Sequence, residues 1–555
     1  MLKTCHALLV VSFLFITQIA LGGEPPAKAG IASAHPLATQ AGFEILNQGG
    51  NAFDAAIAVS AALAVVEPAG SGLGGGGFWL LHRAEDGFQT MIDGREKAPA
   101  AAHRDMYLDE NGKFDKSLSL NGPLAAGIPG VPAALDHLST HYGRLPLKQT
   151  LAPAIRLAKQ GFEVSERYQQ LVGIRLNTLK RSPEASATFL ANGEIPQLGH
   201  LIVQSKLANT LEQIAKQGRA GFYQGTVAEK LVSGVQQAGG IWTEQDLIDY
   251  QVKERTPITG QYRGYKVTSA APPSSGGIAI MSILNQLEQL SFEQAAPTQK
   301  KHLLVEAMRR AYFDRSRYLG DSDFVDVPTQ QLISKSYAKE LSATIDPEYA
   351  SSSNYIVGVE SKGEDTTHFS ILDNEGNRVS ATLSINYPFG SAFVPEGTGV
   401  LLNDEMDDFS AKTGTANVYG LVGNEANAIE ANKRPLSSMS PTFIENDDKL
   451  MIIGTPGGSR IITMVLLGLL DFIDGKEAEE IVKTPRFHHQ YLPDAIQLEA
   501  LGFDESEIDA LKQRGHTIKQ LNRQYGNMHI VIKNKLTHAL SAASDPRGEG
   551  LSLVQ

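Results

Sequence analysis

The sequence has 555 residues, of which 42% are hydrophobic and 20% charged, a composition typical of a soluble globular protein with a large core. Its formal net charge is −12 at pH 7, and no basic stripe with interleaved aromatic residues occurs along it. Nucleic-acid binding is therefore disfavoured, because contacts to phosphates need a concentrated basic surface.

The N-terminus predicts a signal peptide over residues 1–22. Lys3 supplies a positive start, Ala7–Leu21 is an apolar run, and Ala20–Gly22 offers the small residues of a cleavage site. A retained membrane anchor is the alternative, but the run is short for a span. Because the only cysteine, Cys5, lies in this segment, the mature protein has no thiol for catalysis, disulfides or metal binding.

Two helices are predicted at the start of the mature chain. The first ends at Gly49 and Gly50, and the second begins at Asn51, which can cap it with Asp54 in the first turn. Ala55–Val66 is apolar on nearly every face, so we expect the second helix to be buried on all sides.

A glycine-rich stretch, "SGLGGGGFWLLH", follows these helices. Gly72, Gly74 and Gly77 have the spacing of the dinucleotide-binding fingerprint. That fingerprint needs a strand before the glycines and a helix after them, whereas here a helix precedes and the predicted strand Phe78–His82 follows. The stretch therefore predicts close backbone packing or a tight turn.

The middle of the chain alternates helical and extended patterns. Pro146–Ser165 and His302–Gly320 predict amphipathic helices, and the arginines of the second are interpreted as a solvated face. From Ala350 to Asp365 the chain is rich in serine, glycine and charge, which predicts an exposed loop.

Two adjacent histidines, His488 and His489, are the most conspicuous candidates for metal ligands. Neighbouring residues do not share one face of a helix or strand, and no further ligand follows at metal-site spacing. No metal site is predicted.

A β-hairpin is predicted directly after the serine-rich loop. "THFSILD" alternates in polarity, Asp373–Asn377 is a turn signal, and Arg378–Tyr387 alternates again. With the turn centred on Glu375, partners across the hairpin have position numbers that add to about 750. Thr366 therefore lies opposite Ser384, with two hydroxyls facing each other at the open end.

Several further motifs, combined with "DTTH" at 365–368, closely resemble the γ-glutamyltransferases, a family of N-terminal-nucleophile hydrolases. The resemblance spans nearly all of the mature chain. It implies an α+β fold with a four-layer αββα sandwich. The motifs are GNAFDAAIA (50–58), the glycine run, DGREKAP (93–99), LLNDEMDDFS (401–410), NVYGLVG (417–423), NKRPLSSMSPT (432–442), TPGGSRII (455–462) and PRFHHQ (485–490).

The resemblance also implies that the chain is a zymogen that cleaves itself between Asp365 and Thr366. The products are a large subunit (23–365) and a small subunit (366–555), intertwined as one domain. Cleavage frees the Thr366 α-amino group, whose ordinary pKa of roughly 7.7–8.0 suits it to accept the hydroxyl proton. Ser384 stands where the family commonly has threonine, and without the methyl group that fixes the rotamer the processing rate stays open.

A γ-glutamyl donor carries an α-carboxylate and an α-ammonium, so its pocket needs cationic or hydroxyl donors on one side and acceptors on the other. The resemblance implies that Arg95 binds the carboxylate with Ser437 and Ser438, a role that suits the fork-shaped guanidinium. The implied ammonium ligands are Asn386, Glu405 and Asp408.

The remaining candidates bear on the reacting carbonyl and on access to it. Gly457 and Gly458 precede an apolar helical run, so their backbone N–H groups can face a developing oxyanion. Tyr419, in "NVYGLVG", matches the gate of the lid loop that some family members have.

The sequence therefore predicts an exported, self-cleaving γ-glutamyltransferase without cofactors that acts on glutathione and related compounds through a γ-glutamyl-Thr366 ester. Water, or the amine of an amino acid or dipeptide, then takes the acyl group. Export leads to the periplasm if the source is Gram-negative and out of the cell otherwise.

Two alternatives stay open. A cephalosporin or glutaryl acylase uses the same scaffold, but a glutaryl group lacks the ammonium and leaves Glu405 and Asp408 without a counter-charge. An unprocessed protein that only binds γ-glutamyl peptides is the other, and the intact motif Asp365–His368 argues against it.

Overall fold

The structure is a computed structural model that describes residues 28–353, 366–412, 414–423, 425–500 and 502–555. The predicted signal peptide (1–22) and Asp365 lie outside the described residues. None of the described helices combines the length and the apolar character needed to cross a bilayer.

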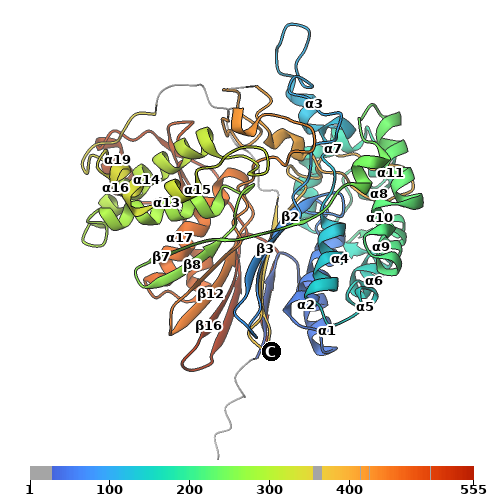
Figure 1. The fold of residues 1–555 in the computed structure, drawn as a ribbon, viewed down its shortest axis with the longest axis horizontal. Helices are drawn as coiled ribbons and strands as arrows, with labels where there is room; N and C mark the ends of the chain where they lie inside the picture. The colour runs from blue at the N-terminus through green and yellow to red at the C-terminus, as the bar shows by residue number, and fades with distance from the viewer. Residues whose placement is uncertain (1–27, 354–365, 413, 424, 501) are drawn as a thin grey trace, which may run out of the picture.

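Two antiparallel sheets lie face to face at the centre of the molecule (Figure 1). The first contains, in spatial order, β18 (Leu551–Val554), β1 (Gly30–Ser33), β9 (Thr367–Leu372), β10 (Arg378–Ser384), β2 (Gly76–His82), β3 (Gln89–Asp93) and β6 (Lys253–Arg255). The second contains β17 (Leu540–Ser544), β16 (His529–Asn534), β12 (Lys449–Gly454), β11 (Thr442–Glu445), β8 (Tyr265–Ser269) and β7 (Ile258–Tyr262).

Helices cover the outer face of each sheet (Figure 1). This arrangement is the α+β four-layer αββα sandwich, which confirms the predicted fold class. On the side of the first sheet lie α1 (Pro36–Asn47), α2 (Ala52–Val66), α4 (Val131–His141), α5 (Leu147–Thr150), α6 (Ala152–Gln160) and α9 (Ser205–Gln217). On the side of the second lie α13 (Gly276–Gln289), α14 (Pro297–Tyr318), α16 (Lys335–Ser342), α17 (Ile461–Ile473) and α19 (Glu505–Gln513).

Strands from before and after Thr366 interleave in both sheets. In the first sheet β1 lies between β18 and β9, and β2 pairs with β10. In the second, β8 pairs with β11. Both parts of the chain therefore contribute strands to each sheet, and neither has a complete sheet without the other.

The predicted start of α2 is confirmed, whereas α1 ends at Asn47, two residues before the predicted Gly49. The Asn51 side chain accepts hydrogen bonds from the backbone of Phe53 and Asp54, while Asp54 accepts from the Asn51 N–H, which forms a capping box. Every residue of α2 is buried, as its apolar faces predicted, and the helix packs against β9 and β10.

The glycine run packs closely against other backbone, as predicted. A Cβ on Gly74 would overlap the Leu401 carbonyl, and one on Gly75 would overlap the Ser384 carbonyl. The run leads into β2, not into a helix, so the dinucleotide interpretation fails on topology. Because its residues are small, the loop of Leu401 and the end of β10 can approach each other closely, beside the candidate active site described below.

The predicted helix over Pro146–Ser165 is wrong in its extent. The segment forms two short helices, α5 and α6, that meet at Leu151, and the chain turns extended at Phe162. Pro153 explains the break, because a proline ring clashes with the carbonyl four residues earlier and offers no N–H.

The solvated-face interpretation of α14 is also wrong for two of its arginines. Arg309 and Arg315 are each 5% exposed, and Arg309 donates to Glu306 and Ser353. Ser353 is itself buried, at the start of the segment predicted to be an exposed loop, whose remainder to Asp365 lies outside the described residues.

Candidate active site

Thr366 and Ser384 meet at the open end of the β9–β10 hairpin. The register pairs Arg378 with Leu372 and Leu383 with Thr367, as predicted from the turn. The hydroxyl oxygens of Thr366 and Ser384 are 3.3 Å apart, and both side chains are 4% exposed. The Asn386 N–H donates to the Ser384 hydroxyl at 2.8 Å, so the loop after β10 fixes the second hydroxyl in place.

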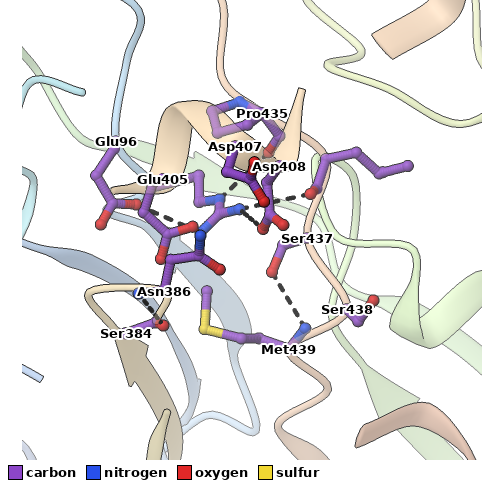
Figure 2. A network of polar contacts seen from close by, with 12 residues as sticks. Glu96, Ser384, Asn386, Glu405, Asp407, Asp408, Pro435, Ser437, Ser438 and Met439 are labelled. Carbon is purple, nitrogen blue, oxygen red and sulfur yellow. Dashed lines mark hydrogen bonds and ion pairs between the residues drawn. The ribbon is translucent and has the colours of Figure 1, made fainter. Parts of the chain in front are cut away.

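Arg95 follows β3 and is 1% exposed. Its partners Glu405 and Asp408, both labelled in Figure 2, lie together in a polar network. Arg95 donates to Glu405 at 2.5 Å and to Asp408 at 2.6 Å, and its Nε donates to the Pro435 carbonyl at 3.2 Å. Predicted carboxylate and ammonium ligands thus touch each other. Their charges are paired within the protein, and a zwitterionic ligand can exchange these pairs for its own.

The carboxyl groups around Arg95 are strongly perturbed. Burial raises the pKa of Glu405 to about 7, although Arg95 opposes the shift, and burial together with Glu405 raises the pKa of Glu96 well above its usual range. Burial alone would lower the pKa of Arg95, but Glu405, Glu96 and Asp408 outweigh it and raise that pKa. The guanidinium therefore stays charged, while the protonation of Glu405 changes near neutrality.

Ser437 and Ser438 line one cavity together with Thr366 and Arg95. In Figure 2 they lie across from Ser384 and Asn386. The Met439 N–H donates to the Ser437 hydroxyl at 3.1 Å, and the Ser437 N–H donates to the Pro273 carbonyl at 2.8 Å. The serine segment therefore rests on a loop that comes from before Thr366.

Gly457 and Gly458 precede α17, with φ angles of 140° and 56° that favour glycine. In the part of the chain that the structure describes, neither backbone N–H donates to another protein atom. Gly458 lines the same cavity as Thr366, whereas Gly457 does not. Of the two predicted oxyanion donors, Gly458 is therefore the one that the structure brings into the cavity of Thr366.

The Tyr419 ring packs against Gly458, and both residues line the cavity of Thr366. The Tyr419 hydroxyl donates to the Asn386 carbonyl at 2.6 Å, and a Cβ on Gly458 would overlap the tyrosine ring. The Asn417 side chain accepts from the Tyr419 N–H and donates to Asp408 at 3.0 Å, which ties this loop to the network. The free volume beside Thr366 is about 20 Å³, which is near that of one water molecule, so little space is open there with Tyr419 in this position.

One cavity brings together all but one of the described candidates: Arg95, Thr366, Ser384, Asn386, Glu405, Asp408, Tyr419, Ser437, Ser438 and Gly458. Gly457 lies just outside its lining, and Asp365 lies outside the described residues. Sequence reasoning did not single out Leu421, Met439, Ser459 and Ile461, which also line it. All four fall inside or beside motifs already recognised, so their position in those motifs was the available signal.

The two adjacent histidines have structural partners. His488 bonds with Thr463 and Gln490, while His489 bonds with Asp494 at 3.2 Å. They therefore engage different partners and do not share a ligand.

A different buried group, His302, Glu306 and His516, comes together from distant positions. The two histidine rings bond with each other at 2.8 Å, and both Glu306 oxygens bond with arginines. The two histidines therefore bond with each other, while Glu306 is paired with arginines of its own helix.

Comparisons with known sequences agree with this arrangement. A sequence profile described as gamma-glutamyltranspeptidase matches residues 38–554. The chain is 44% identical over 530 residues to a glutathione hydrolase proenzyme of Escherichia coli (strain K12), covering 94% of this chain and 91% of that one. It is 38% identical over 545 residues to the glutathione hydrolase proenzyme of Bacillus subtilis (strain 168), covering 94% and 91%.

Solved structures give the same result for the fold. A cephalosporin acylase from Bacillus halodurans superposes with a TM-score of 0.84 at 28% identity, covering 98% of this chain and 99% of that one. A gamma-glutamyltranspeptidase chain from Helicobacter pylori gives 0.56 at 43% identity, covering 57% and 92%.

Proposed function

Because the chain belongs to the gamma-glutamyltranspeptidase family, we propose that it is a γ-glutamyltransferase and glutathione hydrolase whose nucleophile is Thr366. The hydroxyl contact between Thr366 and Ser384, within one cavity with the Arg95 network, is the observation that carries this proposal. The donors are glutathione and related γ-glutamyl compounds, and the acceptors are water and amino acid or dipeptide amines.

Processing comes first in the proposed sequence. The Thr366 hydroxyl attacks the carbonyl of Asp365, the peptide bond becomes an ester, and water hydrolyses it. The large subunit (23–365) and the small subunit (366–555) remain together as a heterodimer because their strands interleave. Export by the segment 1–22 to the periplasm or out of the cell belongs to the same proposal.

Catalysis then uses the amine that processing has freed. This amine takes the Thr366 hydroxyl proton as the oxygen attacks the γ-carbonyl, and the amides of Gly457 and Gly458 stabilise the oxyanion. The amine returns the proton to the leaving nitrogen, and a γ-glutamyl ester remains on Thr366. Water or an acceptor amine attacks that ester and regenerates the hydroxyl.

Recognition of the donor follows from the charges on the cavity wall. Arg95, Ser437 and Ser438 offer donors to the α-carboxylate, and Asn386, Glu405 and Asp408 offer acceptors to the α-ammonium. A glutaryl donor provides no ammonium, so the ligand offers the acidic pair Glu405 and Asp408 no positive charge of its own. This difference favours a γ-glutamyl over a glutaryl or cephalosporin substrate, although a cephalosporin acylase shares the fold.

The direct test compares γ-glutamyl and glutaryl p-nitroanilides with purified wild-type protein, by release of the coloured amine. We expect kcat/KM for the γ-glutamyl compound to exceed that for the glutaryl compound at least about 100-fold, as the loss of a buried charge partner costs roughly 3 kcal/mol or more. A preference for the glutaryl compound would assign the protein to the acylases instead.

The pH dependence of KM should report Glu405. Its pKa of about 7 is raised, so the carboxylate is present above pH 7 and is protonated as the pH falls through 7. We expect KM for the γ-glutamyl anilide to rise about tenfold between pH 8 and pH 6, in proportion to the loss of the ionised form. Glu405→Gln should have a higher KM that stays flat over this range. An equally steep profile in that variant would exclude Glu405 as the titrating group.

Gly458→Ala should strongly reduce activity. The new Cβ overlaps the Tyr419 ring, and the positive φ disfavours any side chain, so the amide at this position is displaced. Losing one oxyanion donor lowers kcat about 100-fold or more. Gly475→Ala is a matched control, because Gly475 also has a positive φ while nothing lies within 4 Å of its Cβ position. Similar kcat values in the two variants would contradict the oxyanion role.

A further inference from the structure

A buried arginine stands behind the serine pair of the active site. Arg315 lies in the last turn of α14 and is 5% exposed. Its Nη2 donates to the Ser438 hydroxyl at 3.2 Å, and its Nε donates to the Ser275 hydroxyl at 3.0 Å. Ser275 in turn donates to the Ser437 carbonyl at 2.7 Å, so one guanidinium is linked to both serines.

The charge of Arg315 is unusual because, in the part of the chain that the structure describes, no carboxylate forms an ion pair with it. Among the described residues Arg315 makes no ion pair, whereas Arg95 contacts Glu405, Asp408 and Glu96. Burying a cation without a counter-ion is costly, and burial lowers the pKa of Arg315 below its ordinary value. An anion bound nearby would offset this free-energy cost.

The direction of the hydrogen bonds decides what the serines can offer to a ligand. Arginine has no acceptor, so the Ser438 oxygen accepts from Arg315 and its own O–H remains to be donated elsewhere. The Ser437 oxygen likewise accepts from the Met439 N–H. Both serines line the cavity of Thr366, so both can present an O–H to a carboxylate there.

Arg315 lies close to the cavity of Thr366. Asp408 and Leu421 line both the Thr366 cavity and the adjoining cavity that Arg315 lines. Two arginines, Arg95 and Arg315, and two acidic side chains, Glu405 and Asp408, line the two cavities. A ligand with one positive and one negative group keeps this balance.

We propose that Arg315 is a positioning residue that orients the Ser438 hydroxyl toward the donor α-carboxylate and supplies the second positive charge of that subsite. The inference rests on the proposed γ-glutamyl specificity and deepens it. Arg315 does not line the Thr366 cavity itself, so it acts through Ser438. Its loss should weaken recognition of the carboxylate and leave the chemistry at Thr366 intact.

Two p-nitroanilides separate this role from a structural one. The γ-glutamyl compound carries the α-carboxylate and the α-ammonium, whereas the 4-aminobutanoyl compound keeps the ammonium and lacks the carboxylate. In Arg315→Met we expect KM for the γ-glutamyl compound to rise about tenfold or more, the effect of one lost charge-assisted hydrogen bond. The kcat for that donor, and kcat/KM for the 4-aminobutanoyl compound, should change less than about threefold. Arg315→Lys should lie between Arg315→Met and the wild type, because it restores the charge without the fork.

The control is Arg317→Met, a change to an exposed arginine on the same helix that should match the wild type. Equal losses on both donors, or an unchanged KM, would overturn the inference. If intact mass or thermal melting shows that Arg315→Met fails to fold or process, Arg315→Lys is tested instead. The quantity compared is the kcat/KM for the γ-glutamyl compound divided by that for the 4-aminobutanoyl compound. A value in Arg315→Lys equal to that of the wild type would overturn the inference. A wild-type protein that does not cleave the γ-glutamyl compound refutes the proposed function first and the inference with it. Wild-type activity without the selective Arg315 effect refutes only the inference.

Discussion

Thr366→Ala is expected to remain a single uncleaved chain with less than about a thousandth of the wild-type activity on γ-glutamyl p-nitroanilide. Without the hydroxyl no ester can form at Asp365, so the α-amino group stays locked in an amide, and the nucleophile for the donor is missing as well. Loss of a catalytic nucleophile lowers kcat by several orders of magnitude. Intact mass under denaturing conditions, measured beside the anilide assay, reports both steps on one sample.

Thr367→Val is the matched control for this change. Thr367 is the next residue on β9, where successive side chains point to opposite faces, so its hydroxyl does not share the face of Thr366. We expect this variant to give two fragments, the smaller beginning at Thr366, and near wild-type activity. Two fragments from Thr366→Ala would refute self-cleavage by this hydroxyl, and one inactive chain from the wild type would favour a protein that only binds its ligand.

Arg95→Met is expected to lower kcat/KM for the γ-glutamyl anilide about 1,000-fold. The substitution removes a donor for the α-carboxylate and leaves Glu405 and Asp408 buried without the cation that now contacts both. Removing one partner of a buried ion pair costs roughly 3–5 kcal/mol, which corresponds to about 100-fold to several thousand-fold in binding. Steady-state kinetics with γ-glutamyl anilide on processed enzyme checks the value.

Arg104→Met serves as the comparison for Arg95→Met. Arg104 also pairs with a glutamate, Glu425, but its side chain is 51% exposed, and exposed ion pairs contribute about 1 kcal/mol or less. This variant should therefore keep wild-type kinetics. Activity of Arg95→Met within tenfold of the wild type would show that the network is structural and that the carboxylate is bound elsewhere.

The local parts of the site could be predicted because their signals lie within a few residues. The turn at Asp373–Asn377 sets the hairpin register, and the register alone places Thr366 opposite Ser384. The capping pattern at Asn51 sets the start of α2 in the same way. The family motifs supplied the rest of the cavity, which no periodicity could have assembled from segments hundreds of residues apart.

The buried arginines of α14 could not be predicted from local pattern. An arginine on a helix is ordinarily solvated, and its burial depends on distant acceptors such as Ser275 and Ser438 for Arg315. The closed position of Tyr419 was equally hidden, since it depends on the Asn386 carbonyl and on the missing side chain of Gly458.

The interleaved strands have a thermodynamic consequence once the chain is cut. With β1 held between β18 and β9, the two fragments unfold together, and denaturation turns one particle into two. Unfolding that releases two chains follows mass action, so the melting temperature of the processed protein should rise with its concentration. The uncut Thr366→Ala chain unfolds as one particle, and its melting temperature should not depend on concentration. The proposed self-cleavage would thus convert a fold stabilised within one molecule into one that dilution can weaken.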